Sequence, residues 1–238
     1  MLFRSAGQLD NSGTTYYVVT DIMNSAHSMP IQDTWVFTVG ADLQPNKVAV
    51  LPVPFFDRAS TTTEISHDVS CVISDLNNDG LNDIIVVSAL NSAEVQQGTA
   101  PHQSKVQVYL NQGGLSFNDV TDTAFPGWNQ NILSTYTPRI FDFNGDGKPD
   151  IWVMNADWQN ASANQAWINN GSGQFTQVKN TELSRMLTDF RSANSSSSST
   201  LGIMLPLKFG GKWDFVFTAD AGTRTSIGYV KSQWTFAP

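Results

Sequence analysis

The sequence predicts an all-β protein made of about four four-stranded antiparallel units that pack side by side. Residues that favour strands and turns, such as Val, Thr, Ser, Asn and Gly, abound, whereas charged residues make up only 14% of the chain. A segment rich in Asp, Asn and Gly recurs after 67 positions, and a strand-turn-strand segment recurs behind it. A chain of 238 residues with 40% hydrophobic content can bury the core of one such domain or of two small ones. We assign residues 1–238 to a single repeat domain.

The repeat is clearest in the middle of the chain. Residues 71–87, CVISDLNNDGLNDIIVV, match residues 139–154, RIFDFNGDGKPDIWVM, and the glycines Gly80 and Gly147 lie 67 positions apart. An equal step backwards reaches Gly13, and a step of 64 forwards reaches Gly211. The predicted units are therefore residues 1–66, 67–133, 134–198 and 199–238, of which the middle two keep intact loops.

Each unit is expected to contain a strand, a polar loop, a second strand and a closing hairpin. Ile84–Val87 are apolar without alternation, which is typical of a strand that is covered on both faces. The hairpins are predicted at Lys105–Val120 and Gln165–Val178, where an Asn and Gly turn precedes a strand that opens with Phe. Asn170 and Gly171 favour a tight turn because both tolerate a positive φ. Four strands per unit indicate a β-propeller-type array, whose blades bury their faces only by stacking.

Three features lie outside this pattern. The stretch Ser192–Thr200 has almost no apolar residues and is predicted to be a mobile loop. Thr181–Phe190 has apolar residues at helical spacing, which predicts a short surface helix. Cys71 is the single cysteine and lies in an apolar run, so we expect a buried core residue.

Both intact loops follow the pattern D-x-N-x-D-G-x-x-D, which sets oxygen ligands at alternate positions of a tightly curled backbone. The Gly permits the sharp turn, and the carbonyl of the seventh residue can add another oxygen. Hard oxygen ligands in this number, without Cys or His, favour calcium over zinc and magnesium. We predict two calcium ions per chain, held by Asp75, Asn77, Asp79, Leu81 and Asp83 in one loop and by Asp142, Asn144, Asp146, Lys148 and Asp150 in the other.

Two other interpretations of these loops are weaker. An EF-hand opens in the same way but needs a Glu at position twelve, where the two loops have Val86 and Val153. A metal-free turn rich in Asn and Asp would be an adequate explanation for a single copy of the pattern. It explains less well why the full pattern occurs twice at the same place in the repeat. Because Asp83 and Asp150 also open the following strand, their replacement by Ala is expected to destabilise the protein in calcium and to have no effect in a chelator.

The loop segments resemble the calcium loops of FG-GAP and VCBS-type repeats, which occur in integrin α-subunit propellers and in many bacterial extracellular proteins. The later segments YLNQGGLSF and WINNGSGQF resemble the closing hairpins of these repeats, so the resemblance covers about Val69–Val178. It implies that each loop joins the first two strands of a blade and binds calcium structurally. The ligand positions fall on Gln8, Asp10, Ser12 and Tyr16 in the first unit and on Pro206, Lys208, Gly210 and Asp214 in the last, so neither unit is expected to hold calcium.

The expected function is that of an extracellular binding, adhesion or assembly module with a protein or carbohydrate ligand, secreted or at the cell surface. The net charge of −8, with 13 basic residues, argues against nucleic acid and anionic membranes, and no apolar run is long enough to span a membrane. Trp128 and Trp158 lie in polar segments and could stack on sugar rings, although structural packing is the commoner role. Family propellers commonly have more than four blades, so the chain could close on itself, pair with another copy or form part of a larger propeller.

Two alternatives stay open at this point. One is a calcium-dependent polysaccharide lyase or hydrolase, but Asp157, Glu94, His102 and Arg139 form no recognisable catalytic constellation, so we expect no enzyme. The other is a structural protein whose repeat edges polymerise into filaments.

Overall fold

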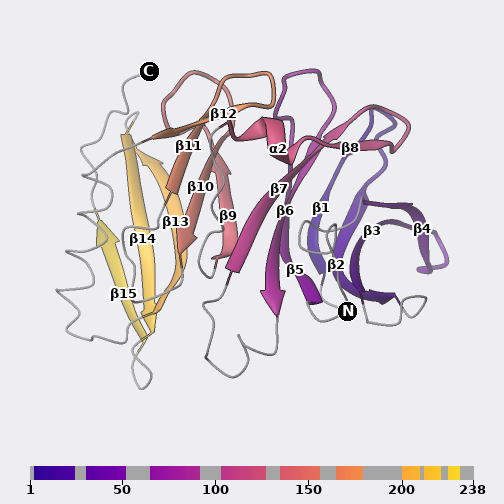
Figure 1. The fold of residues 1–238 in the computed structure, drawn as a ribbon, viewed down its shortest axis with the longest axis horizontal. Coiled ribbons are helices and arrows are strands. Elements are labelled where there is room, and N and C mark those ends of the chain that lie inside the picture. Colours follow the sequence, from indigo (N-terminus) through magenta and orange to yellow (C-terminus); the bar gives the residue numbers. More distant parts are fainter. Residues whose placement is uncertain are drawn as a thin grey trace.

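The structure is a computed structural model that describes residues 3–24, 31–51, 65–91, 103–126, 135–155, 165–178, 200–209, 212–220 and 225–230. Within these residues the chain forms antiparallel sheets in a row, and the row is not closed into a ring (Figure 1). The helical segment among them is α2 (Thr121–Ala124), which has four residues. The prediction of an all-β, blade-like array is confirmed.

Three sheets have four strands and one has three, and each runs in chain order. The first sheet contains β1 (Phe3–Gly7), β2 (Tyr16–Asn24), β3 (Ile31–Val39) and β4 (Pro45–Val50); the second contains β5 (Ile65–Ser74), β6 (Asp83–Asn91), β7 (Gln103–Asn111) and β8 (Phe117–Asp119). The third contains β9 (Thr135–Phe141), β10 (Asp150–Asn155), β11 (Gln165–Asn169) and β12 (Phe175–Val178); the fourth contains β13 (Thr200–Phe209), β14 (Lys212–Asp220) and β15 (Thr225–Val230).

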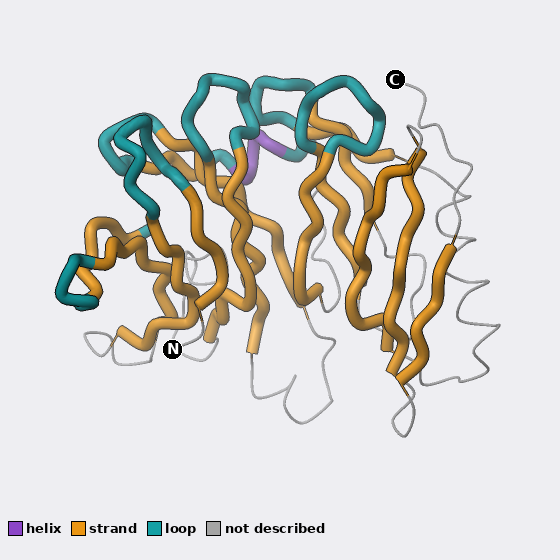
Figure 2. Tube along the Cα trace, turned by 180° about the vertical axis from the view of Figure 1, so that it is seen from behind, coloured by secondary structure: helices purple, strands orange, loops and turns teal. Residues whose placement is uncertain are grey.

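The strand register shows that the first three sheets are built alike. Gly7 pairs with Tyr16, Ser74 with Asp83 and Phe141 with Asp150, so the residues between the first two strands are 8–15, 75–82 and 142–149. These loops are of equal length and lie, with most of the others, along one end of the strands (Figure 2).

The fourth sheet departs from this plan. Phe209 pairs with Lys212, so only positions 210 and 211 join β13 to β14. Pro206 and Lys208 lie within β13 and Asp214 within β14, whereas Gly210 lies outside the described residues. For Pro206, Lys208 and Asp214 the expectation of ligand positions in a degenerate loop is wrong, because β13 continues through the positions at which the other sheets begin their loops.

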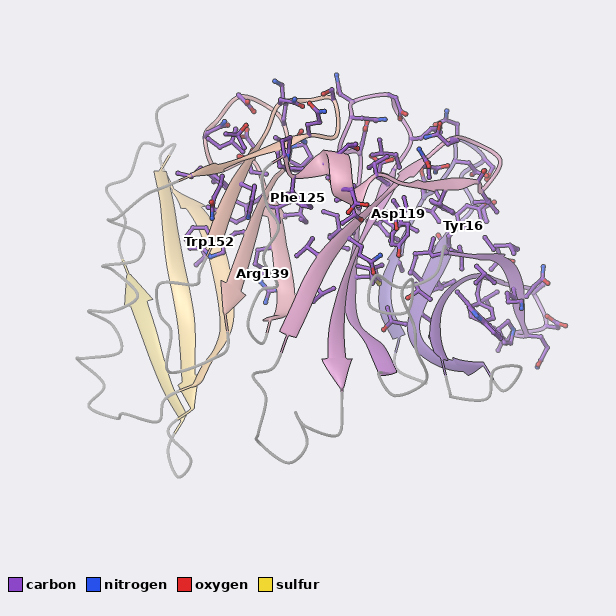
Figure 3. All side chains as sticks on the ribbon, viewed as in Figure 1. Tyr16, Asp119, Phe125, Arg139 and Trp152 are labelled. Atoms are coloured by element: carbon purple, nitrogen blue, oxygen red, sulfur yellow. The ribbon has the colours of Figure 1, made fainter. Side chains whose placement is uncertain are left out.

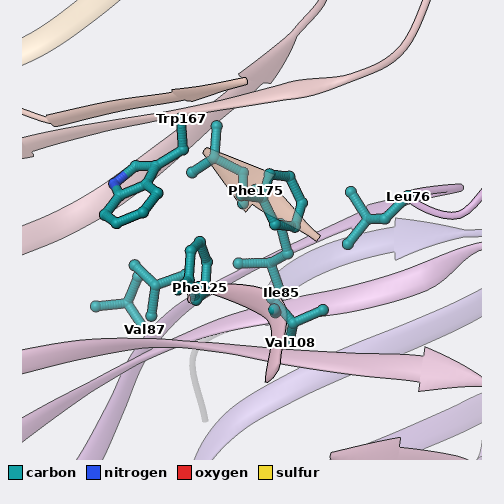
Figure 4. Close-up of a cluster of buried hydrophobic side chains, with 10 residues drawn as sticks. Leu76, Ile85, Val87, Val108, Phe125, Trp167 and Phe175 are labelled. Atoms are coloured by element: carbon teal, nitrogen blue, oxygen red, sulfur yellow. The ribbon is translucent and has the colours of Figure 1, made fainter. Parts of the chain in front are cut away.

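Two hydrophobic clusters fill the spaces between the first three sheets. One joins the first and second sheets and includes Val18, Val36, Cys71 and Ile84. Cys71 is buried and forms no disulfide, as predicted. The other cluster joins the second and third sheets, where Phe125 stacks on Phe175 and meets the edge of Trp167, and its members are drawn in Figure 4.

The apolar run that begins at Ile84 explains why the sheets pack on both faces. Ile84 and Val86 belong to the cluster shared with the first sheet, and Ile85 and Val87 belong to the cluster shared with the third. Successive residues of a strand point to opposite faces, so an unbroken apolar run covers both. The prediction of a strand that is buried on both faces is confirmed.

The closing hairpins are present, but their turns differ from the expected type. β8 and β12 open with Phe117 and Phe175, as predicted. Positive φ angles fall on Gly171 and Gly173 and not on Asn170, whose side chain instead accepts the backbone N–H of Ser172 at 2.8 Å. The Asn and Gly pair therefore belongs to a longer loop, 170–174, and not to a two-residue turn.

Several expectations concern residues outside those described. They are the helix at Thr181–Phe190, the loop before Thr200, and the two tryptophans Trp128 and Trp158. Among the described residues, no helix has the length and apolar character that a membrane span requires.

Candidate metal centre

The two intact loops carry all ten predicted ligand positions at equal places in consecutive sheets. In each loop eight residues connect the first two strands, and the ninth position, Asp83 or Asp150, opens the second strand. The glycine of each loop, Gly80 or Gly147, has a φ of +85°, a conformation that L side chains rarely adopt. The local fold therefore depends on the glycine that the motif supplies.

The first carboxylate of each loop holds the curl through backbone hydrogen bonds. Asp75 accepts the N–H groups of Asp79 at 3.2 Å and Gly80 at 3.0 Å. Asp142 likewise accepts the N–H groups of residues 145, 146 and 147 at 2.6, 3.1 and 2.9 Å. The backbone is thus wrapped around this side chain in both loops.

The third and fifth positions complete the curl. The N–H of Asp79 is shared between Asp75 Oδ1 and Asn77 Oδ1, at 3.2 Å each, which brings these two oxygens close together. Asn144 Oδ1 accepts the N–H of Asp146 at 3.0 Å in the same way. The amide of Asn77 also donates to Asp79 Oδ2 at 2.9 Å. Side-chain oxygens of positions one, three and five therefore gather on one small loop.

The ninth position has a role that the motif alone did not reveal. Asp83 is fully buried, and its two oxygens accept the N–H groups of Leu76 and Asn111, each at 2.8 Å. Asp150 is buried in the same way and accepts the N–H groups of Phe143 at 3.1 Å and Asn169 at 2.8 Å. Each carboxylate thus joins its loop to the third strand of its own sheet.

Burial changes the ionisation of both carboxyl groups. Burial raises the pKa of Asp83 to about 6. The hydrogen bonds from the two backbone N–H groups lower this pKa, and the nearby carboxylates of Asp79 and Asp75 raise it. Burial raises the pKa of Asp150 to about 6 as well. A positive charge near these carboxylates would favour their ionised form.

Two asparagines that the sequence analysis treated as turn residues connect neighbouring sheets. Asn111 donates from Nδ2 to the carbonyl of Leu9 in the first sheet, at 2.6 Å, and to Asn82 in its own loop, at 3.0 Å. Asn169 Nδ2 repeats this contact with the carbonyl of Leu76 in the second sheet, at 2.8 Å. Both asparagines are buried. The signal in the sequence was the shared Asn at the end of Y-L-N and W-I-N.

The loop of the first sheet is closed by its own side chains. The Tyr16 hydroxyl, at the ninth position, donates to Asp10 Oδ2 at 2.6 Å, and the Ser12 hydroxyl donates to Asp10 Oδ1 at 2.5 Å. These two hydrogen bonds lower the pKa of Asp10, and the bond from Ser12 has the larger effect. The hydrogen bond to Asp10 in turn raises the pKa of Tyr16. Figure 3 shows Tyr16 in the first sheet. Hydrogen bonds here take the place that the motif gives to additional carboxylates.

The third sheet carries a cation of its own beside the loop. Lys148, at the seventh position, places its ammonium nitrogen 3.8 Å from Asp146 Oδ2 and donates to the carbonyl of Asn170 at 2.9 Å. Leu81 occupies the same position in the second sheet. The two loops therefore differ in charge at one ligand position, although the predicted ligand there is the backbone carbonyl.

The loops fit a hard cation by the chemistry of their donors. In the described part of the chain, no three His, Cys, Asp or Glu side chains form a group that could hold a metal ion by themselves. Each loop instead gathers two carboxylates and an asparagine oxygen, while the third carboxylate points into the interior. A carboxylate oxygen has two lone pairs, so Asp83 and Asp150 can bind backbone N–H groups and still contribute to a site. Oxygen-only sets of mixed type suit calcium.

The candidates for catalysis are not brought together in the described residues. Asp157, Glu94 and His102 lie outside them. Arg139 lies in β9, where it is half-buried and burial lowers the pKa of its guanidinium, and Figure 3 shows it near Trp152 in the third sheet.

Comparison with known protein families gives a match over the middle of the chain. The sequence model of a family described as FG-GAP-like repeat matches residues 75–153 and, again, residues 142–200. Together these segments span more than half of the chain, and each begins at the first carboxylate of an intact loop. None of the curated proteins compared with the chain matches it.

Proposed function

Because the chain belongs to the FG-GAP-like repeat family, we propose that it is a calcium-stabilised, propeller-like module that binds or assembles with a partner outside the cell. The repeat family and the row of antiparallel sheets support the propeller-like part. Calcium, the extracellular setting and the partner are the parts that the proposal adds.

One observation carries the calcium proposal. The same pattern of side-chain-to-backbone hydrogen bonds curls two loops of identical length at identical places in consecutive sheets. Ordinary turns rich in Asn and Asp would not need three carboxylates, a glycine at positive φ and this pattern twice. In each loop this pattern gathers the side-chain oxygens of two carboxylates and an asparagine, which are the donors that calcium prefers.

The proposed ligands are the residues that the motif marks. Asp75, Asn77 and Asp79 would supply side-chain oxygens in one loop, the carbonyl of Leu81 a backbone oxygen, and the buried carboxylate of Asp83 the innermost contact. The second site would be held in the same way by Asp142, Asn144, Asp146, Lys148 and Asp150. Calcium would neutralise the crowded carboxylates and tie each loop to its sheet, so that binding free energy adds to folding stability.

Structural calcium sites of this kind fit an extracellular setting, where calcium is abundant. Two divalent ions would change the formal net charge from −8 to −4, which still disfavours polyanions such as nucleic acids. The partner we propose is a protein or a carbohydrate. We assign no catalytic role, because a half-buried arginine alone does not provide a paired acid and base.

Thermal unfolding of the full chain at neutral pH tests the proposal. Calcium should raise the melting temperature, and magnesium should raise it less. Asp79→Asn or Asp146→Asn should each remove part of the calcium effect, while the new amide oxygen can still accept the N–H of Leu81 or Lys148, now bound at 2.8 and 2.9 Å. Asp42→Asn is the control, because Asp42 also accepts a backbone N–H, from Gln44 at 3.1 Å, but lies outside the loops. Equal melting temperatures with calcium and without any metal would refute the calcium role.

A further inference from the structure

The large hydrophobic side chains that are exposed in the described part of the chain all lie in the first sheet. Val39, Leu43 and Val50 have exposed fractions of 43%, 80% and 45%. Val39 ends β3, Val50 ends β4 and Leu43 lies in the loop between these strands. Val36 of β3 packs towards the second sheet, so Val39, an odd number of residues away, lies on the opposite face. We call these three residues the end surface, since the first sheet stands at one end of the row (Figure 1).

The position of Val39 is used for contact with the preceding sheet elsewhere in the molecule. Val39 pairs with Pro45 at the end of β3, as Asn111 pairs with Phe117 and Asn169 with Phe175 at the ends of β7 and β11. Asn111 reaches the loop of the first sheet, and Asn169 reaches the loop of the second. In the first sheet the same position is apolar and exposed.

The position of Leu43 shows the same relation. The hairpin loops 40–44, 112–116 and 170–174 share a hydrogen bond from the N–H of the first residue to the carbonyl of the fifth, at 3.1, 2.8 and 2.9 Å. The fourth residue of each has a positive φ: +61° at Leu43, +60° at Leu115 and +76° at Gly173. Leu115 packs against the cluster shared with the first sheet, and a Cβ on Gly173 would lie 3.2 Å from Leu110 of the second sheet. This loop position therefore faces the preceding sheet in both cases.

Leu43 is unfavourable on two counts in the chain by itself. Its backbone has a φ that leucine rarely adopts, and its side chain is almost entirely in water. At Leu115 an equal backbone conformation is accompanied by packing on a neighbouring sheet. A strained conformation together with an exposed apolar side chain points to a contact that covers it.

We propose that the end surface docks the fourth sheet of a second copy of the chain, in the same way as the second sheet docks on the first and the third on the second. The inference rests on the assembly role proposed above and names the partner for that role. Leu43 would occupy the place that Leu115 occupies against the first sheet, and Val39 would cover the partner's sheet where the other sheets use an asparagine.

The first and fourth sheets each lack one half of the asparagine-to-loop contact that joins the other sheets. Asn111 and Asn169 each bind a carbonyl of an eight-residue loop in the preceding sheet. The fourth sheet has no such loop, because Phe209 pairs with Lys212. A sheet that docks behind it would therefore need no amide donor. The first sheet has none, since Val39 stands at the position that Asn111 and Asn169 occupy in the other sheets.

A head-to-tail contact of this kind gives a closed ring of two copies when both pairs of ends meet. It gives an open chain of copies when they do not. Either form buries the end surface and is continuous with the stacking inside the chain. An open apolar end would otherwise be a site for unspecific association.

The proposal is tested by analytical sedimentation of the full 238-residue chain in calcium, which measures self-association over a wide range of protein concentrations. The chain should self-associate, and Leu43→Asn should weaken association by about tenfold or more, since a buried leucine side chain is lost while asparagine tolerates the positive φ. The same variant should melt no lower than the wild type. Val39→Asp should also weaken association. The control Asn46→Asp adds an equal charge and should leave association unchanged, because Asn46 is exposed and pairs with Thr38 on the other face of the sheet.

A chain that is monomeric at every concentration, or one whose association is unchanged by Leu43→Asn, would overturn the proposal. Calcium binding, measured on the same variants, separates this result from failure of the proposed function, since Leu43 lies outside both metal loops. Calcium bound by a strictly monomeric chain would refute the docking surface alone. Association lost in Leu43→Asn by a chain that binds no calcium would support the docking surface and refute the calcium role.

Discussion

Asp83 joins three parts of its sheet through a single buried carboxylate. Its oxygens bind the N–H of Leu76 in the loop and the N–H of Asn111 at the end of β7. These contacts do not need a metal ion, so the expectation that replacement by Ala has no effect in a chelator does not follow from the structure. Asp83→Ala should lower the free energy of unfolding by about 2 kcal/mol or more even in the metal-free protein, because two buried N–H groups lose their acceptor.

Chemical denaturation of the metal-free protein measures this effect. Asp42→Ala is the matched control, as its carboxylate makes a similar backbone contact at an exposed site. If Asp83→Ala unfolded at the same denaturant concentration as the wild type without metal, the buried carboxylate would not be a structural brace.

The raised pKa values of Asp83 and Asp150, each about 6, give the metal-free protein a distinct pH dependence. Below the unfolded pKa of about 3.9 both states hold the proton, so the contribution of these groups to stability is fully present. As pH rises towards 6, the unfolded chain releases the proton first, and this stability is lost. The melting temperature of the metal-free protein should therefore fall between about pH 4 and pH 6, and calcium should stabilise most at pH 7 and least at pH 4.

Melting curves across this range, with calcium and without metal, provide the measurement. The fall in the metal-free protein should be reduced when Asp83 and Asp150 are both replaced by Asn, which does not titrate. A calcium effect as large at pH 4 as at pH 7 would contradict carboxylate ligation.

Tyr16 is the ninth residue of the loop that the motif predicts to be without metal. Tyr16→Phe removes the hydroxyl that donates to Asp10 at 2.6 Å and leaves the ring in its buried position. We expect a loss of about 1 kcal/mol that is equal in calcium and in chelator. Denaturation under both conditions measures it, and a loss that appears only in calcium would mean that the first loop also binds the ion.

At the scale of elements, the contact between sheets depends on the asparagines that end β7 and β11. Asn111→Ala should destabilise the protein by about 2 kcal/mol, since the carbonyls of Leu9 and Asn82 both lose their donor. The exposed neighbour Gln112 provides the control, and Gln112→Ala should change stability by less than about 0.5 kcal/mol. Equal effects of the two variants, measured by denaturation, would show that the amide does not link the sheets.

The strands and loops of the middle units could be predicted because their signals are local. The D-x-N-x-D-G-x-x-D pattern determines a curl through contacts within a few residues, and the apolar run Ile84–Val87 determines burial on both faces. The asparagine contacts could not be predicted, since Asn111 and Leu9 are 102 positions apart and meet only when the sheets stack. In the fourth unit, the glycine at position 211 suggested a loop, whereas the continued pairing of β13 with β14 leaves no room for one.

At the scale of the whole molecule, the sheets form a row, and the first three bury one another's faces. Stability in such an array is close to a sum of the units and of the contacts between neighbours. The first three sheets are connected by hydrophobic clusters and by asparagines that bind the preceding loop. The loop at 75–82, which we propose to bind calcium, is also the loop that Asn169 of the third sheet contacts, so an ion that orders this loop would also order that junction.

Calorimetric titration of the metal-free chain with calcium at neutral pH tests this account most directly. The account predicts two ions per chain, one after either Asp79→Ala or Asp146→Ala, and none when both substitutions are combined, with Asp42→Ala retaining two. No heat of binding, or four equivalent sites, would contradict it.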